Sequence, residues 1–179
     1  MNLEQTAVVL IDVQGRLATL MNRHEETLRK LEQLLKGAKT LELPILWLEQ
    51  YPRGLGPTVD SLAEILSPIT KPIEKITFSA WGTDEFKEAL IASGKKQILL
   101  CGIETHICVY QTAKDLKAAG FHVEVVADAV DSRFELDREI ALRRFEQENI
   151  PLTTVEMALF ELLEVAKGDA FKQVSKIIK

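Results

Sequence analysis

The chain has no long hydrophobic run and no excess of basic residues, and these absences exclude several classes of protein. No stretch approaches the ~20 apolar residues that a membrane-spanning helix needs. The opening segment MNLEQTAVVLIDVQG lacks a basic leader and a small-residue cleavage site, so we expect no signal peptide. The 27 acidic residues outnumber the 22 basic ones, which gives a net charge of −5. We therefore expect neither nucleic acid nor a membrane surface as a partner.

Cysteine and histidine are scarce. The two cysteines, Cys101 and Cys108, do not make a disulfide framework, so we expect a reduced, cytoplasmic protein. The three histidines, His24, His106 and His122, are scattered along the chain and do not have the spacing of a metal-ligand set. The sequence therefore predicts no metal and no cofactor.

The size and composition are typical of one globular domain. The chain has 179 residues, of which 46% are hydrophobic and 27% charged. It contains no repeat, no low-complexity tract and no linker. We therefore predict a single domain over residues 1–179, with enough buried surface for a catalytic pocket.

Short apolar runs alternate with amphipathic stretches along the whole chain. The apolar runs predict strands at 7–11, 45–48, 72–75, 97–103, 122–128 and 151–155. The amphipathic stretches predict a helix up to Leu41, which Asn22 and Glu25 would cap, and helices at 59–66, 84–92, 106–119 and 135–148, with further helix at the end. Segment 50–60 is rich in Gly and Pro and is expected to be a loop.

Alternating strands and helices indicate an α/β fold with right-handed crossovers. We predict a three-layer, doubly wound domain with a six-stranded, mostly parallel, Rossmann-like sheet of order 3-2-1-4-5-6. Ligands of such sheets bind at the carboxyl ends of the strands. The polar residues at those ends are therefore the candidates for a functional site.

Two charged residues stand at predicted strand ends. Asp12 directly follows the first strand, where it could face a ligand or simply cap a turn. Lys75 ends the third strand, but lysines are usually exposed, and Lys71 competes for the same role. Lys75 is preferred because its strand should end beside the strand that carries Asp12.

Cys108 lies just past the most apolar strand, at the start of the following helix. If Thr105 is the N-cap, unpaired N–H groups and the helix dipole would favour a Cys108 thiolate. Cys101 lies inside the strand and should be an inert core residue, and Cys108 could equally be a small core residue. Taken together, an acid, an ammonium and a thiol at neighbouring strand ends are the groups that covalent acyl transfer requires.

With these residues in place, the sequence resembles the isochorismatase-like cysteine hydrolases, which include nicotinamidases and N-carbamoylsarcosine amidohydrolases. The resemblance covers nearly the whole chain and rests on VVLIDVQ, K-x-x-F-S-A at 75–80 and LLCGIETHICV. The stretches LEQYPRGLGPTV, VVADAVDSR and FKQVSKIIK are most similar to the isochorismatase domain-containing proteins, a subgroup with poorly defined substrates.

The resemblance implies a catalytic triad of Asp12, Lys75 and Cys108. It also implies a cis peptide bond between Ile103 and Glu104, with the backbone N–H groups of Glu104 and Cys108 as an oxyanion hole. The activity implied is hydrolysis of the C–N bond of a small amide, or of a related carbonyl compound, through a thioester. Family members usually form oligomers, so a homo-oligomer is expected.

Two departures from the family pattern restrict the substrate. Nicotinamidases carry a metal-binding Asp-x-His pair where this chain has Glu49-Gln50-Tyr51, which is a further reason to expect no metal and disfavours nicotinamide. Isochorismatase itself lacks the cysteine, so Cys108 disfavours vinyl-ether hydrolysis.

Candidate substrate contacts are Gln50, Tyr51, Phe78 and Trp81, although aromatic residues beside a strand end are often core. Arg133 could reach the mouth of the site, but pairing with Asp131 at the surface is the preferred interpretation. A binding or scaffold protein without turnover is the alternative to an enzyme. A nucleotide-binding Rossmann domain is disfavoured because DVQGRL, after the first strand, lacks the pattern G-x-G-x-x-G.

Overall fold

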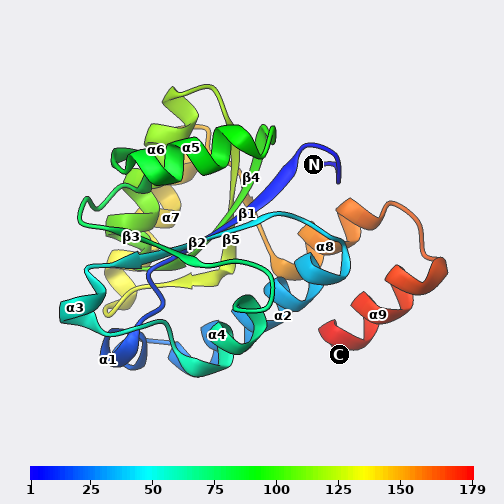
Figure 1. The fold of residues 1–179 in the computed structure, drawn as a ribbon, viewed down its shortest axis with the longest axis horizontal. Helices are drawn as coiled ribbons and strands as arrows, with labels where there is room; N and C mark the ends of the chain where they lie inside the picture. The colour runs from blue at the N-terminus through cyan, green and yellow to red at the C-terminus, as the bar shows by residue number, and fades with distance from the viewer.

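The computed structural model describes residues 1–179 and contains one six-stranded sheet between two layers of helices (Figure 1). The strand order is β3-β2-β1-β4-β5-β6, which confirms the predicted order. Every strand pair is parallel, so the sheet is wholly rather than mostly parallel. The strands are β1 (Thr6–Ile11), β2 (Ile45–Gln50), β3 (Pro72–Lys75), β4 (Gln97–Ile103), β5 (His122–Asp131) and β6 (Leu152–Thr153).

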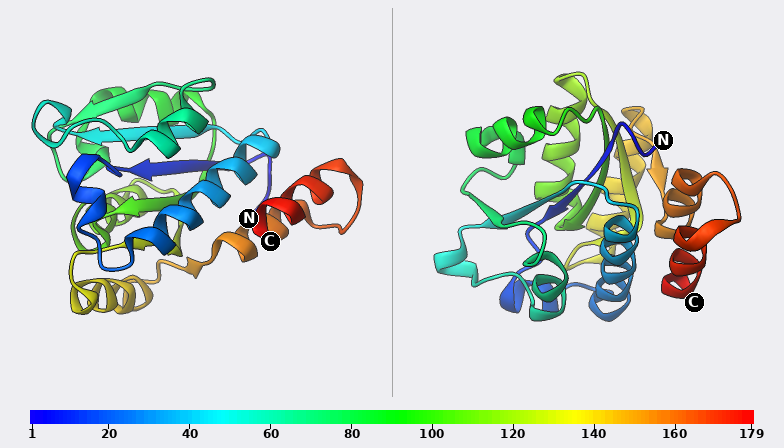
Figure 2. Two further views of the ribbon diagram at one scale, coloured as in Figure 1. Left: turned by 90° about the horizontal axis from the view of Figure 1, so that it is seen from below. Right: turned by 45° about the vertical axis from the view of Figure 1, so that its right-hand side comes forward.

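Helices cover both faces of the sheet, as the right-hand view in Figure 2 shows. One face packs against α5 (Asp84–Ala92), α6 (Tyr110–Ala118) and α7 (Glu135–Gln147). The other packs against α2 (His24–Thr40), α4 (Asp60–Leu66), α8 (Val155–Leu163) and α9 (Gly168–Ile178). Short helical segments complete the chain: α1 (Gly15–Thr19), α3 (Pro52–Leu55), η1 (Ala80–Gly82) and η2 (Thr105–Val109).

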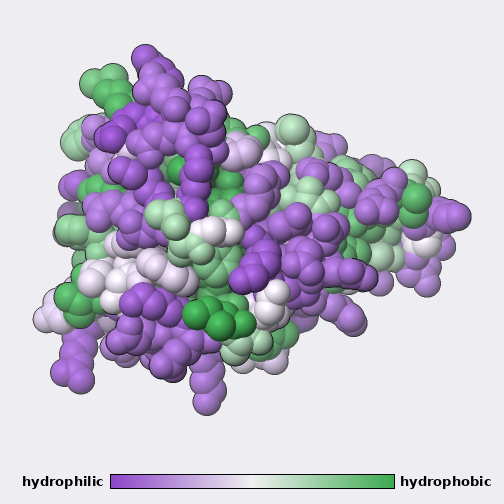
Figure 3. All heavy atoms as spheres, turned by 90° about the horizontal axis from the view of Figure 1, so that it is seen from above, coloured by the Kyte–Doolittle hydropathy of each residue, from purple (hydrophilic) through white to green (hydrophobic).

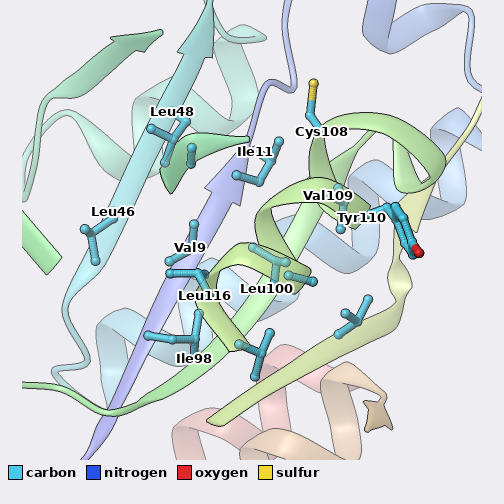
Figure 4. Packing of buried hydrophobic residues seen from close by; sticks show 14 of the residues in the cluster. Val9, Ile11, Leu46, Leu48, Ile98, Leu100, Cys108, Val109, Tyr110 and Leu116 are labelled. Atoms are coloured by element: carbon cyan, nitrogen blue, oxygen red, sulfur yellow. The ribbon is translucent and has the colours of Figure 1, made fainter. Parts of the chain in front are cut away.

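The central strand β1 is buried along its whole length because both of its faces meet a helical layer. Successive side chains of a strand point to opposite faces, and here they enter two separate cores. Val9 and Ile11 join the cluster beneath α5 and α6, whereas Val8 and Leu10 join the cluster beneath α2. Figure 4 shows the first of these clusters. A rigid central strand of this kind fixes the position of whatever follows Ile11.

Gly102 is required where β4 passes the end of β1. Its φ of +112° is disfavoured for any side chain, and a Cβ placed there would lie 2.1 Å from the Ile11 carbonyl oxygen. This close approach lets Gly102 pair with Ile11, and the register between β4 and β5 shifts at the same point. The strand then ends at a cis peptide bond between Ile103 and Glu104. The chain leaving β4 therefore starts its next helix directly beside the end of β1.

That next helix begins differently from the sequence-based expectation. Thr105 is not the N-cap; it is the first residue of a π-helical turn, η2, and Glu104 is the extended residue before it. A π-helical turn is wider than an α-helical one and is often found at functional sites. Cys108 lies within this turn, and α6 continues from Tyr110.

The start of α2 also differs from the predicted cap. Asn22 and Glu25 do not form a capping pair, because the Asn22 side chain donates to Glu135 at 2.7 Å. A carboxylate from the end of β5 takes the capping role instead, since Asp131 accepts from the Arg23 backbone N–H at 2.7 Å. A partner from a distant strand cannot be read from local spacing.

Two further segments depart from the predicted elements. The loop at 50–60 contains the single-turn helix α3, and the last strand is only Leu152–Thr153 instead of 151–155. None of the helices is both long and apolar enough to cross a membrane. The face seen in Figure 3 is mainly hydrophilic, and its hydrophobic residues lie in small separate groups.

Candidate active site

The structure brings Asp12, Lys75 and Cys108 together at the carboxyl edge of the sheet. Asp12 directly follows β1, Lys75 is the last residue of β3, and Cys108 lies in η2 after β4. Lys75 Nζ donates to Asp12 Oδ2 at 2.7 Å, and both side chains are almost completely buried. The Cys108 side chain points away from the packed core, beyond Ile11 at the end of β1 (Figure 4). Cys101 is fully buried within β4 and lines no part of this site.

The ammonium group of Lys75 is saturated by acceptors of the protein. Besides Asp12, Nζ donates to Gln50 Oε1 at 2.6 Å and to the carbonyl oxygens of Thr77 at 3.2 Å and Phe78 at 3.1 Å. A lysine ammonium has three N–H donors, so four acceptors leave none free. Lys75 is therefore paired with Asp12 and has no free N–H donor for an anionic ligand.

A glutamine pair connects this ion pair to the chain around it. The Gln50 side chain donates to the Ile76 carbonyl at 2.7 Å, and its backbone N–H donates to Gln14 Oε1 at 2.6 Å. Gln14 in turn donates to the carbonyl of Gly56 at 2.7 Å, in the segment that follows α3. The amides thus fix both the lysine and the loop beside it.

Asp12 is set up to accept a proton. Its φ of +53° is unusual for an aspartate and turns the backbone sharply at the end of β1. Burial raises the pKa of Asp12 above its ordinary value, against the opposing effects of the Lys75 charge and contact with the Cys108 thiol. Oδ2 is bonded to Lys75, whereas Oδ1 is buried and accepts no hydrogen bond of ordinary geometry. Oδ1 is therefore the free basic position of the site.

The surroundings of Cys108 favour the neutral thiol, whereas the helix-dipole argument favoured a thiolate. Burial, together with the negative charge of Asp12, raises the pKa of Cys108 to about 12, and the Lys75 charge offsets only part of this rise. The helix dipole is a smaller influence than desolvation at this depth. A reaction of Cys108 as a thiolate would therefore require a base, and Asp12 is the ionisable acid in contact with the thiol.

The pH dependence of alkylation tests this conclusion. The rate for Cys108 with iodoacetamide should rise about tenfold per pH unit from pH 7 to 9.5 without levelling, because the thiolate fraction keeps growing below a pKa of about 12. Peptide mass spectrometry would follow the labelling, with Cys101 as the buried control that labels far more slowly. A plateau below pH 9 would instead indicate a preformed thiolate.

A cavity of about 120 Å³ opens beside the three groups. Its lining residues are Asp12, Leu17, Gln50, Leu55, Phe78, Ile103, Glu104, Ile107 and Cys108. The cavity thus holds two of the four predicted substrate contacts, Gln50 and Phe78.

The other two predicted contacts lie elsewhere. Trp81 packs edge-on against Phe86 and Phe121, with ring centroids 6.5 and 5.5 Å apart, and so belongs to the core beneath α5. Tyr51 is exposed and lines a separate hollow that includes Arg53. Both residues follow a strand that ends at the site, but their side chains do not line the cavity.

Sequence reasoning missed three apolar residues of the cavity. Leu17 comes from α1, Leu55 from α3 and Ile107 from η2. The first two lie in segments with no periodic pattern, because each helix is a turn or so long. Their only signal is an apolar residue in an otherwise polar or glycine-rich stretch close to a strand end.

Glu104 and Arg133 form an ion pair at the edge of the cavity. Arg133 Nε lies 3.1 Å from Glu104 Oε2, and the Arg133 backbone N–H donates to the same oxygen at 3.0 Å. Arg133 therefore pairs with Glu104. The expected pairing with Asp131 is wrong. The Glu104 backbone N–H donates no hydrogen bond within the chain, which leaves it available to a ligand.

Glu49 has a structural role in place of a metal-binding one. Its Oε1 accepts from the backbone N–H of Thr58 at 2.7 Å and from the Thr58 hydroxyl at 2.8 Å. Trp47 Nε1 donates to the same hydroxyl at 2.7 Å. No three His, Cys, Asp or Glu side chains gather into a group that could hold a metal ion.

Comparison with known proteins gives consistent matches over nearly the whole chain. A family model described as the isochorismatase domain matches residues 6–157. Isochorismatase domain-containing protein 2 of Xenopus laevis is 39% identical over 98% of this chain and 84% of its own. The secreted isochorismatase effector Isc1 of Phytophthora sojae is 35% identical over 97% of this chain and 84% of its own.

Solved structures share the fold closely. A MAR1 ribonuclease from Caenorhabditis elegans has a TM-score of 0.93 and 35% identity, covering 99% of this chain and 91% of its own. The YcaC gene product of Escherichia coli, described as an octameric hydrolase of unknown specificity, has a TM-score of 0.93 and 27% identity, covering 99% and 88%. YcaC from Pseudomonas aeruginosa, solved with hexane-2,5-diol and covalent acrylamide, has a TM-score of 0.93 and 26% identity, covering 99% and 89%.

Proposed function

The chain belongs to the isochorismatase domain family and has its hydrolase fold, and from this premise we propose that it is a cysteine-dependent hydrolase of small amides or related carbonyl compounds. The observation that carries the proposal is the buried Asp12–Lys75 pair beside the Cys108 thiol, with Asp12 Oδ1 left without a partner. A thiol, a base and a charge partner at the wall of one cavity form the arrangement used in covalent acyl transfer.

In the proposed reaction, Asp12 takes the thiol proton as Cys108 Sγ attacks the substrate carbonyl carbon. The tetrahedral oxyanion accepts hydrogen bonds from the backbone N–H groups of Glu104 and Cys108, where one lost donor typically costs ~3 kcal/mol. Asp12 then gives the proton to the leaving nitrogen as the C–N bond breaks, which leaves a thioester. The amine departs, and a water molecule that gives a proton to Asp12 attacks the thioester. As the C–S bond breaks, the acid is released and Asp12 returns the proton to the sulfur, which restores the thiol.

Lys75 supports this cycle without touching the substrate. Burial raises the pKa of Asp12, and the positive charge of Lys75 opposes that rise and so favours the ionised form of the acid. It also opposes the rise in the pKa of Cys108 that the Asp12 charge causes. The proposed role of Lys75 is therefore to balance the charge of the base before and after proton transfer.

The relatives agree with a reactive site but do not define its substrate. One is described as a hydrolase of unknown specificity, and another carries covalent acrylamide, an electrophile that adds to thiols. The Caenorhabditis elegans relative is described as a ribonuclease. RNA is disfavoured as a substrate of this chain, because the cavity is small and the net charge of −5 would repel a polyanion. We propose a small-molecule substrate, a cytoplasmic location and, like the octameric relative, a homo-oligomer.

Trapping the acyl-enzyme tests the proposal. After mixing with an activated acyl ester and acid quenching, the peptide that contains Cys108 should carry the acyl mass, and hydroxylamine should remove it, because thioesters react with this nucleophile. The Cys101 peptide serves as the internal control. No adduct on Cys108, together with no turnover of a panel of amides, esters and an RNA oligomer, would favour the binding or scaffold alternative. Cleavage of the RNA alone would favour a ribonuclease.

A further inference from the structure

The wall of the cavity around Cys108 is mainly apolar. Five of its nine lining residues are Leu17, Leu55, Phe78, Ile103 and Ile107. Leu55 and Phe78 are among the large hydrophobic side chains that remain exposed, with 36% and 54% of their surface accessible. Apolar side chains that are exposed around a concave site mark a surface that a ligand covers.

The same wall offers no free positive charge. Neither lysine, arginine nor histidine is among the lining residues, and the ionisable ones besides Cys108 are two acids, Asp12 and Glu104. The cations next to these acids are paired with them, Lys75 with Asp12 and Arg133 through Nε with Glu104, and neither cation lines the cavity. A substrate carboxylate or phosphate inside the cavity would therefore lie next to two acids with no cation in the lining, which is unfavourable in a partly buried place.

The size of the cavity limits the group that reacts. A dry cavity of about 150 Å³ accommodates benzene, which has six non-hydrogen atoms. The cavity of about 120 Å³ beside Cys108 therefore suits an acyl group of about four to six non-hydrogen atoms. A longer chain would have to leave through the rim between Leu55 and Phe78.

We infer that the site selects uncharged substrates with a short apolar acyl group, such as butyryl or isobutyryl compounds, and rejects their anionic analogues. This inference rests on the proposed function for turnover, but the selection itself is a property of the cavity. It follows from the apolar lining, the two acids and the lack of any cation among the lining residues.

Two thiol reagents of nearly equal size test the selection without requiring turnover. Iodoacetamide is neutral and iodoacetate is an anion, so the ratio of their rates with Cys108 measures discrimination against negative charge. We expect this ratio to exceed that of free 2-mercaptoethanol by at least about tenfold, because the anion loses solvation without gaining a partner. A ratio equal to that of the free thiol, or smaller, would overturn the inference.

A positive charge placed at the rim should weaken the discrimination against anions. Leu55→Lys adds a cation at the mouth of the cavity and should lower the reagent ratio at least about threefold, because the anion then has a partner. Ile91→Lys is the matched control, since Ile91 is 64% exposed on α5 and lines none of the cavity; it should leave the ratio within about twofold. Equal effects of the two variants would contradict the assignment of the rim.

A matched substrate pair separates this inference from the proposed function. Butyramide and malonamate both have acyl groups within this size range, and they differ mainly by a carboxylate in place of the terminal ethyl group. Turnover of butyramide with little of malonamate supports both the inference and the function. Equal or faster turnover of malonamate overturns the inference but leaves the function in place. No turnover of either, with the reagent ratio raised, supports the selective cavity and argues against the hydrolase.

Discussion

Cys108→Ala is expected to lower kcat/KM by at least about 10³-fold for every substrate that the protein hydrolyses, because no other group can form the thioester. The fold should survive, since the sulfur lies at the wall of a cavity and points away from the packed core (Figure 4). Steady-state kinetics and urea unfolding of the same preparation would check both statements.

Cys101→Ala is the control with the opposite expectation. Cys101 is fully buried inside β4, and its only hydrogen bond is a 3.5 Å contact with the Val9 carbonyl. Removing its sulfur should cost about 1 kcal/mol of folding free energy through the small cavity left behind, with kcat/KM changed by no more than a few-fold. Retention of hydrolysis in Cys108→Ala, or its loss in Cys101→Ala, would refute the assignment of the nucleophile.

Lys75→Met should have the largest effect on stability, lowering the free energy of unfolding by about 3–5 kcal/mol at pH 7. The substitution removes the only charged partner of Asp12 and leaves a carboxylate buried without compensation. It also removes the donor to Gln50 and to two backbone carbonyls. The double variant Asp12→Asn/Lys75→Met should recover much of the loss, because no unpaired charge then remains in the protein interior.

The deficit of Lys75→Met should shrink as the pH falls from 7 toward 5. The pKa of Asp12 is raised in the folded protein by burial, and it rises further without the Lys75 charge that lowers it. A carboxyl whose folded pKa is raised contributes stability that is lost as the pH rises through that pKa, so protonation at lower pH restores it. Urea unfolding at several pH values would measure the trend.

Lys87→Met provides the matched control for this series. Lys87 is paired with Asp84 at 3.0 Å on the exposed surface of α5, where a salt bridge is worth at most about 1 kcal/mol. A loss in Lys75→Met no greater than that in Lys87→Met would show that the buried pair is not a stabilising unit. The Asp12→Asn/Lys75→Met variant would then show no recovery.

The sheet could be predicted from sequence because each strand carries its own signal. The runs AVVLI and ILLCGI are apolar without interruption, as is typical of strands covered on both faces. The alternation of strands with helices then leaves few possible strand orders. Two of the predictions that were wrong concern helix starts, which depend on residues far away in the chain. The cap of α2 comes from Asp131, more than one hundred positions later, and the π-helical turn at Thr105 follows the unusual approach of Gly102 to Ile11.

The candidate site likewise has features that the sequence predicts and features that depend on tertiary structure. The meeting of parallel strand ends at one edge predicts that Asp12, Lys75 and Cys108 lie close together, and the structure brings the three together there. Proximity to a strand end also makes Trp81 a candidate, but its ring packs against Phe86 and Phe121 in the core. Position along a strand can be read from sequence, whereas the direction in which a loop turns a side chain depends on tertiary packing. The raised pKa of Cys108 likewise follows from its depth and from Asp12, which no local motif reveals.

The rim of the cavity is built from parts that contribute nothing to the sheet. Leu17 and Leu55 lie on helices of five and four residues, and Phe78 lies between β3 and η1. Changes in these segments can reshape the cavity while Asp12, Lys75 and Cys108 keep their places at the strand ends. Mutational libraries confined to the three segments would therefore diversify substrate preference with little cost to folding, and natural divergence within the family has the same route open to it.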